Sequence, residues 1–274
     1  MAKWKLKAQD KNKIRNKDEV LVDLHFHLGK QDSLKEPLGK LVKAIDVISI
    51  TGRGDRFANI FEYDFVSFLN QLKNESIPYT LHNDVLCEIS LSDKTLDVIK
   101  SQEIHTKEGF DIVVVGSPEN FNDDISINEI INRAKNSIIL LSTPFQIPNS
   151  IKTRLKDDYK TEQIANITDV IEVHNQSLFF NKSNTKAHSL SLKIDRPGIA
   201  VSDQHLYSKF KYPLNLSGVI LQRTSSKENF VGQLKNNLLA KKFTNYSVYS
   251  IYSFLEFFAL SPKDLKKLFY GKKF

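Results

Sequence analysis

The stretch Val-Leu-Val-Asp-Leu-His-Phe-His-Leu, residues 20–28, restricts the fold of this chain more than any other feature. Asp23, His25 and His27 alternate in it with apolar residues, and a period of two is typical of a β-strand. On a regular strand these three polar side chains share one face. Neutral imidazole is a common metal ligand, and two imidazoles at the end of one strand can reach the same cation. The stretch therefore predicts a strand that delivers metal ligands.

Two later apolar runs end in the same way. One ends in Glu172 and His174, and the other ends in Asp203 and His205. A single pair of this kind could be an ordinary pair of surface or core-edge side chains. Three strand endings that carry ligand-type residues at equal spacing favour a shared metal site instead.

The composition indicates the cellular compartment of such a protein and the charge of its partners. Cys87 is the only cysteine, which excludes an internal disulfide framework and a cysteine-rich zinc site. Residues 1–19 are polar and basic, and no apolar run is long enough to cross a bilayer, so we expect a cytoplasmic protein without membrane contact. The formal net charge is +7, with basic residues crowded over 3–17 and 263–273. Such ends attract anions such as phosphate backbones, or serve only solubility.

Strand-like and helix-like segments alternate along the chain. Short β-branched runs predict strands at 46–51, 79–81, 85–91, 110–116, 137–142, 198–202 and 216–221. Helical spacing of apolar residues predicts helices at 33–44, 59–74, 126–135, 183–193 and 226–239. This order indicates parallel βαβ units in an α/β fold, and about seven such strands favour a barrel, in which reacting groups gather at the C-terminal strand ends.

With these residues in view, the chain resembles the PHP (polymerase and histidinol phosphatase) superfamily of metal-dependent phosphoesterases. Residues 23–27, Asp-Leu-His-Phe-His, look like its first motif, and residues 46–51 are similar to the strand of its second. Glu88 falls where the family has a bridging glutamate, and residues 202–205, Ser-Asp-Gln-His, look like the last motif. The resemblance covers about residues 18 to 240.

The resemblance implies a distorted seven-stranded (β/α) barrel with C-terminal helices. We expect a basic segment at 1–18, the barrel at 19–240, and a helical, basic extension at 241–274 that packs on it. The C-terminal face of such a barrel holds divalent ions, namely zinc, manganese or iron. The ligands that the resemblance implies are His25, His27, Glu88, Asp203 and His205, and His205 could instead carry a proton.

The sequence departs from the family at several ligand positions. Gly52 and Arg53 stand where the family has Asp-His, so one or two ions are expected rather than three. Asp55 and His174 are further candidate ligands that could compensate. Arg53 could contact the substrate phosphate bidentately. Alternatively, Arg53 could pair with Asp55 or Glu88 and fill an emptied metal site.

These observations lead to three hypotheses about function. The first is a metal-dependent phosphoesterase that hydrolyses a phosphate mono- or diester of a small molecule or nucleic acid through a metal-activated water. The second is a catalytically degenerate PHP-like module that binds an anion, nucleic acid or partner protein. The third is an amidohydrolase-type enzyme, whose barrels also open with His-x-His, but the chain is short and lacks an evident bridging lysine motif. The oligomeric state is open.

Overall fold

The computed structural model describes residues 4–6, 16–53, 62–145, 158–175, 181–206, 217–224 and 226–247, with the backbone alone for 4–6, 181–182 and 205–206. The strands are β1 (Trp4–Leu6), β2 (Glu19–Leu28), β3 (Val47–Arg53), β4 (Tyr79–Asn83), β5 (Leu86–Leu91), β6 (Lys94–His105), β7 (Asp111–Val115), β8 (Ile138–Leu141), β9 (Val170–Asn175), β10 (Gly198–Val201), β11 (Gln204–Leu206), β12 (Ser217–Gln222) and β13 (Phe243–Ser247). The helices are α1 (Lys35–Ala44), α2 (Phe65–Asn74), α3 (Ile127–Arg133), α4 (Asp158–Ile167), α5 (Asn181–Lys193) and α6 (Phe230–Leu239).

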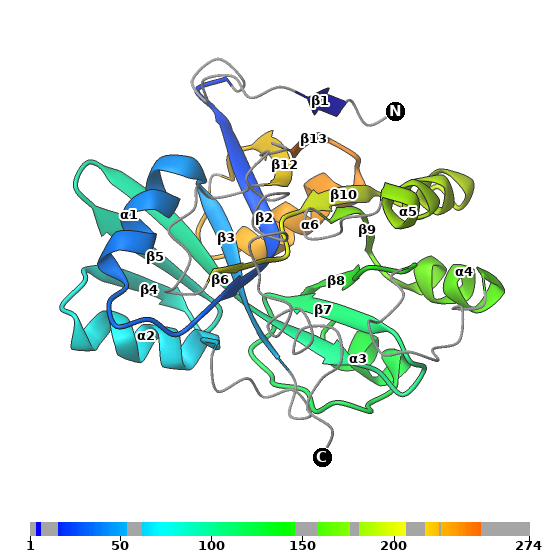
Figure 1. Cartoon of the computed structure of the whole chain (residues 1–274), viewed down its shortest axis with the longest axis horizontal. Coiled ribbons are helices and arrows are strands. Elements are labelled where there is room, and N and C mark those ends of the chain that lie inside the picture. Colours follow the sequence, from blue (N-terminus) through cyan, green and yellow to red (C-terminus); the bar gives the residue numbers. More distant parts are fainter. Residues whose placement is uncertain are drawn as a thin grey trace, which may run out of the picture.

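Seven strands form the barrel, in the order β2, β3, β6, β7, β8, β9 and β10 (Figure 1). Each pairs with its neighbour in parallel except β7, which is antiparallel to both β6 and β8. After β10 the chain enters β11, which pairs in parallel with β2 and brings the last strand back to the first. The sheet is therefore nearly closed. The predicted mixed α/β fold with a distorted seven-stranded barrel is confirmed.

Further strands extend the sheet at two places. β12 pairs with β2, β13 pairs with β12, and β1 pairs with β13. The hairpin of β4 and β5 attaches to the first half of β6, and β7 attaches to the second half of the same edge. The expected helical extension from 241 differs from the structure, because residues 243–247 form β13 within the sheet. The helices expected beyond Ser247 lie outside the described residues.

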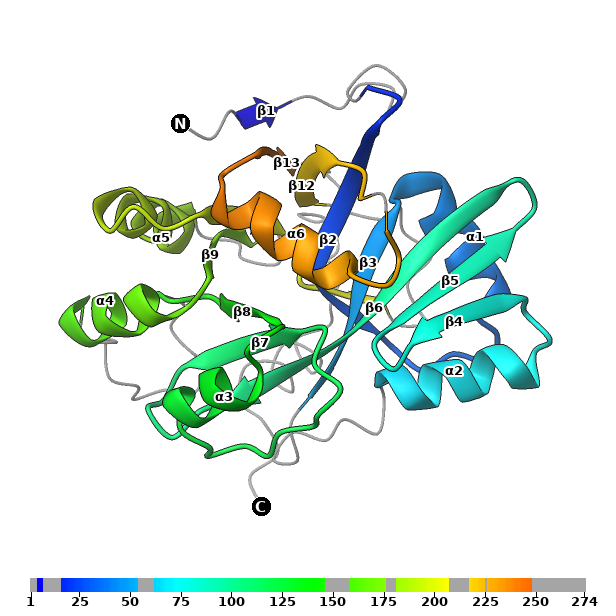
Figure 2. The same cartoon turned by 180° about the vertical axis from the view of Figure 1, so that it is seen from behind.

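Apolar side chains from all seven barrel strands meet in one cluster, which places this cluster in the interior. Its strand members include Val22, Val47, Ile99, Val113, Leu140, Val170 and Ile199. Leu234 and Leu238 of α6 join it, and Figure 2 shows α6 lying against the barrel strands. Full burial of such a side chain contributes about 1.5–3 kcal/mol relative to exposure. The interior is thus a packed core that supports the rim above it.

An irregularity in β2 decides which way its histidines face. The pairing of β2 with β3 shifts register between Asp23 and Phe26. Before the shift Val22 and Leu24 lie in the interior cluster, whereas Phe26 after it lies in the outer cluster with α1 and α2. His25 and His27 therefore face the interior side. The expectation of strict alternation, with Asp23 on the same face as the histidines, is wrong for this reason.

Side-chain caps mark the starts of two helices, α2 and α3. Asp64 accepts a hydrogen bond from the backbone N–H of Ser67, whose hydroxyl accepts one from the N–H of Asp64. This capping box starts α2 at Phe65, later than the predicted start at residue 59. At α3 the hydroxyl of Ser126 accepts a hydrogen bond from the backbone N–H of Glu129, close to the predicted start of the helix. Among the described helices, none has both the length and the apolarity needed to cross a membrane.

A glycine on β12 allows the close contact between β12 and β2. A Cβ at Gly218 would lie 2.3 Å from the carbonyl oxygen of Val22. We expect Gly218→Ala to lower the free energy of unfolding by about 1–3 kcal/mol, because the backbone of β12 must move. The matched control is Gly39→Ala in α1, where a Cβ would meet nothing within 4 Å. Urea unfolding measures both, and equal stability of the two variants would contradict this packing.

Candidate metal centre

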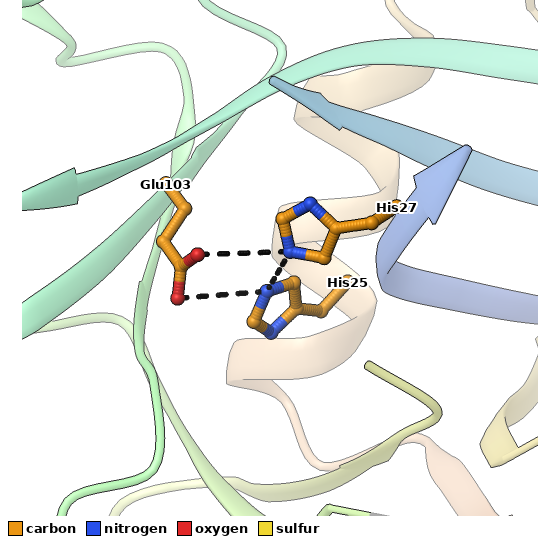
Figure 3. Close-up of side chains that lie close together, drawn as sticks. All are labelled: His25, His27 and Glu103. Carbon is orange, nitrogen blue, oxygen red and sulfur yellow. Dashed lines mark hydrogen bonds and ion pairs between the residues drawn. The ribbon is translucent and has the colours of Figure 1, made fainter. Parts of the chain in front are cut away.

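Two histidines and one glutamate meet at the C-terminal rim of the barrel. His25 and His27 lie near the end of β2, and Glu103 lies near the end of β6. Their ligand atoms all lie within 4.8 Å of one another (Figure 3). The Nε2 atoms of the two histidines are 3.0 Å apart. Oε1 of Glu103 lies 3.8 Å from Nε2 of His25, and Oε2 of Glu103 lies 3.6 Å from Nε2 of His27. The three side chains converge because their strands run in the same direction and end at one rim.

Asp203, which follows the last barrel strand β10, lies beside the two histidines at the same rim. Its Oδ1 atom lies 3.5 Å from Nε2 of His25 and 3.6 Å from Nε2 of His27. Its N–H donates to the carbonyl oxygen of His25, and the side-chain amide of Asn175 donates to its Oδ2 at 2.8 Å. These bonds hold Asp203 at a φ of 46°, a left-handed conformation that few non-glycine residues adopt. The predicted meeting of His25, His27 and Asp203 therefore occurs.

Two further carboxylates stand behind the histidines. The Nδ1 atom of His25 lies 3.1 Å from Glu172, and the Nδ1 atom of His27 lies 3.2 Å from Glu62. A carboxylate at Nδ1 favours the tautomer that carries its proton there and leaves a lone pair on Nε2. The Nε2 atoms of both histidines face the same space, together with Glu103 and Asp203. This is the arrangement that metal-binding histidines have in proteins.

The charges around the histidines are mostly negative. Glu62, Glu103, Glu172 and Asp203 surround the pair, and Arg53 contacts two of them, Glu62 and Glu103. Burial alone would lower the pKa of His25, but Asp203, Glu172 and Glu103 outweigh it and raise this pKa to about 10. Burial raises the pKa of Glu103 and of Glu172. The site therefore favours an additional positive charge.

The residues present fit a divalent cation. Imidazole nitrogen and carboxylate oxygen are ligands that zinc, manganese and iron accept. Two nitrogen ligands of a tetrahedral zinc ion lie about 3.3 Å apart, close to the separation of the two Nε2 atoms. Both histidine side chains are fully buried, whereas those of Glu103 and Asp203 are 16% and 14% exposed. The group thus meets solvent on its carboxylate side, where a substrate can approach.

Arg53, at the end of β3, contacts this group directly. Its Nε donates to Glu62 at 3.3 Å, and its Nη1 lies 3.4 Å from Glu103. These contacts differ from the interpretation that Arg53 pairs with Glu88, and the alternative pairing with Asp55 stays a prediction. Asp55 lies outside the described residues.

Glu88 is not brought to this group. It faces Asp97 across the β5–β6 pair, six residues before Glu103 on β6, which is about 20 Å of strand. Its carboxylate lies 2.9 Å from the ammonium of Lys227 and 3.8 Å from His82. The carboxylate that the family resemblance assigned to Glu88 is supplied at the rim by Glu103.

The two remaining candidates have different outcomes. His205 lies in β11 with its backbone paired opposite His27, and its side chain is outside the described residues. Nε2 of His174 lies 2.8 Å from the hydroxyl of Ser247 on β13, and His174 is not part of the converging group. Burial lowers the pKa of His174 to about 4.

Sequence reasoning missed Glu103 and Glu62, and it noted Glu172 only as a partner of His174. Glu103 was missed because β6 was not predicted, since its apolar residues do not alternate regularly. One signal could have found β6. Ser92 and Asp93 follow the predicted strand at 85–91, and this short polar pair between two β-prone runs is typical of a hairpin turn. Ser92 has a φ of 57°, as such turns require.

Comparison with known proteins supports the fold. No protein-family model matches the sequence, and a search of curated proteins found no match. PsfC from Pseudomonas syringae PB-5123 is similar in structure, with a TM-score of 0.55 at 10% identity over 86% of this chain and 93% of that chain. The lesion-specific endonuclease Q from Pyrococcus furiosus gives a TM-score of 0.48 at 13% identity over 89% and 67%. A Bifidobacterium adolescentis protein, proposed to be a metal-dependent phosphoesterase, gives 0.46 at 11% over 80% and 96%.

At these identities the likeness concerns the fold and not the activity. The likeness to PsfC therefore supports the expected fold, while the resemblance to the PHP superfamily rests on the motifs of the sequence. Of these three structures, PsfC is the one with a TM-score above 0.5, and its identity of 10% carries no chemistry to this chain, so the chemistry has to be inferred from the residues of the rim.

The carboxylate behind His25 gives a direct test of the metal centre. We expect Glu172→Gln to weaken zinc or manganese binding by about 10–100-fold, because the neutral amide no longer supports the Nδ1–H of His25. Competition with a chromophoric chelator measures the affinity. Glu119→Gln, a change on an exposed glutamate that pairs with Arg133, should leave it unchanged. Equal affinity of the native protein and Glu172→Gln would contradict this role.

Proposed function

We propose that this protein is a metal-dependent phosphoesterase that hydrolyses a phosphate mono- or diester. The observation that carries the proposal is the convergence of His25, His27 and Glu103, with a buried carboxylate behind each histidine. This donor set fits a divalent ion, and its carboxylate side faces solvent. When bound, such an ion supplies Lewis acidity that polarises a phosphoryl oxygen and acidifies water.

The residues of the chain would divide the remaining work. His25, His27, Glu103 and Asp203 would hold the ion, while Glu172 keeps the Nδ1 proton on His25 and Glu62 lies 3.2 Å from Nδ1 of His27. Arg53 would contact a phosphoryl oxygen of the substrate, since its side chain is 27% exposed and a guanidinium has five donors. His205 is proposed as a further ligand or a proton carrier, because β11 places its backbone beside His27.

The substrate class follows from charge rather than from a recognisable pocket. A centre that combines a divalent ion with a guanidinium suits an anionic phosphate ester. The net charge of +7 would also attract a polyanion such as nucleic acid. We therefore propose a phosphorylated small molecule or a nucleic acid as substrate, and zinc, manganese or iron as the metal.

One observation favours the second candidate function, a degenerate module that binds an anion, nucleic acid or partner without hydrolysis. The guanidinium of Arg53 is already engaged by Glu62 and Glu103, next to the histidines. If these ion pairs persist when an anion binds, the rim would hold the anion without arranging it for attack by water.

A hydrolysis assay distinguishes the two candidates. We expect metal-free protein to cleave p-nitrophenyl phosphate or its diester only after manganese or zinc is added. Loss of a carboxylate behind a metal ligand reduces activity about 10–100-fold. Glu103→Gln removes a ligand itself, so we expect it to reduce the rate further. Glu119→Gln, on the exposed surface, should keep the native rate.

The outcomes separate clearly. Bound metal without turnover, together with salt-sensitive binding of an oligonucleotide, would favour the binding module. Absence of both bound metal and turnover would remove the proposal of a metallophosphoesterase.

A further inference from the structure

Arg53 shares its carboxylate partners with His27. One oxygen of Glu62 lies 3.2 Å from Nδ1 of His27 and 3.3 Å from Nε of Arg53. One oxygen of Glu103 lies 3.6 Å from Nε2 of His27 and 3.4 Å from Nη1 of Arg53. The guanidinium therefore bridges a carboxylate on each side of the imidazole. It is part of the centre and not a separate surface ion pair.

The position of Arg53 relative to Glu103 matches that of a cation. In two-metal sites the ions lie about 3.5–4 Å apart and both are close to the reacting oxygens. The Glu103 carboxylate has the geometry of a bridging group, since Oε1 faces His25 at 3.8 Å while Oε2 faces both His27 and Arg53. On the side of His27 the cation beside this carboxylate is the guanidinium.

Burial and charge make this position difficult to share. The side chain of Glu62 is only 3% exposed, and that of Glu103 is 16% exposed, so water screens these contacts weakly. A guanidinium does not lose its proton in proteins, so its charge is permanent. A second divalent ion beside it would be repelled, and would find Glu62 and Glu103 already engaged.

We propose that the guanidinium of Arg53 takes the place of a second divalent ion, so that the centre binds a single metal ion per chain. This inference rests on the proposed metal centre of His25, His27, Glu103 and Asp203. In this arrangement Arg53 supplies the second positive charge, holds the orientation of Glu103, and keeps its remaining N–H groups for a phosphoryl oxygen.

The test is the number of ions bound per chain, measured by elemental analysis after dialysis against manganese or zinc. We expect one ion for the native protein and for Arg53→Lys, which keeps the charge. Arg53→Met and Arg53→Gln remove the charge and free both carboxylates, so we expect them to bind two ions. With manganese, the second ion should also give an exchange-coupled electron paramagnetic resonance spectrum, which does not depend on activity.

A matched control keeps the result specific. Arg133 pairs with Glu119 and Glu129 away from the centre, so Arg133→Met should still bind one ion. Two ions in the native protein, or one ion in folded Arg53→Met and Arg53→Gln alike, would overturn this inference while leaving the metal centre in place. A native protein that binds no ion would instead refute the metal centre itself.

Discussion

The rim of this barrel depends on a balance of charge around two fully buried imidazoles. His25 and His27 have carboxylates behind them at Nδ1 and carboxylates before them at Nε2. Burying this much negative charge is costly unless a cation compensates it, because protein interiors screen charge poorly. Arg53 supplies one positive charge, and a bound divalent ion would supply two more. The buried carboxylates that lower the stability of the folded state therefore also favour the binding of a metal ion.

The barrel closes through the residues that carry the site. Ser202 donates its hydroxyl and its N–H to Asp23, and Asp203 donates its N–H to the carbonyl oxygen of His25, which joins β10 to β2. Burial raises the pKa of Asp23 to about 7, although these hydrogen bonds oppose it. Asp203 has a positive φ, a left-handed conformation that aspartate adopts more readily than most residues with a Cβ. The hydrogen bonds that close the sheet between β10 and β2 thus also fix the position of Asp203, a candidate ligand.

Different observations support the fold and the proposed chemistry. PsfC shares the fold at 10% identity, and a barrel of this kind can serve many reactions. The phosphoesterase proposal rests instead on the donor set and on Arg53, whose guanidinium pairs with Glu62 and Glu103. The guanidinium of Arg53 carries a permanent positive charge beside Glu62 and Glu103. It would lower the number of metal ions that the centre binds, while the carboxylates are still compensated by positive charge. The presence of Arg53 beside the histidines is therefore consistent with the electrostatics of the rim.

Much of the arrangement was readable from the sequence. The strand–helix order predicted the barrel, and the strand endings predicted that His25, His27 and Asp203 meet, because strands of one direction end at one rim. Three features were decided only in three dimensions. The register shift in β2 turned the histidines inward and Asp23 away, β6 brought Glu103 in place of Glu88, and Arg53 found Glu62 as its partner. Local spacing fixes which residues can share a strand face, but pairing register and contacts between distant segments depend on how the whole sheet packs.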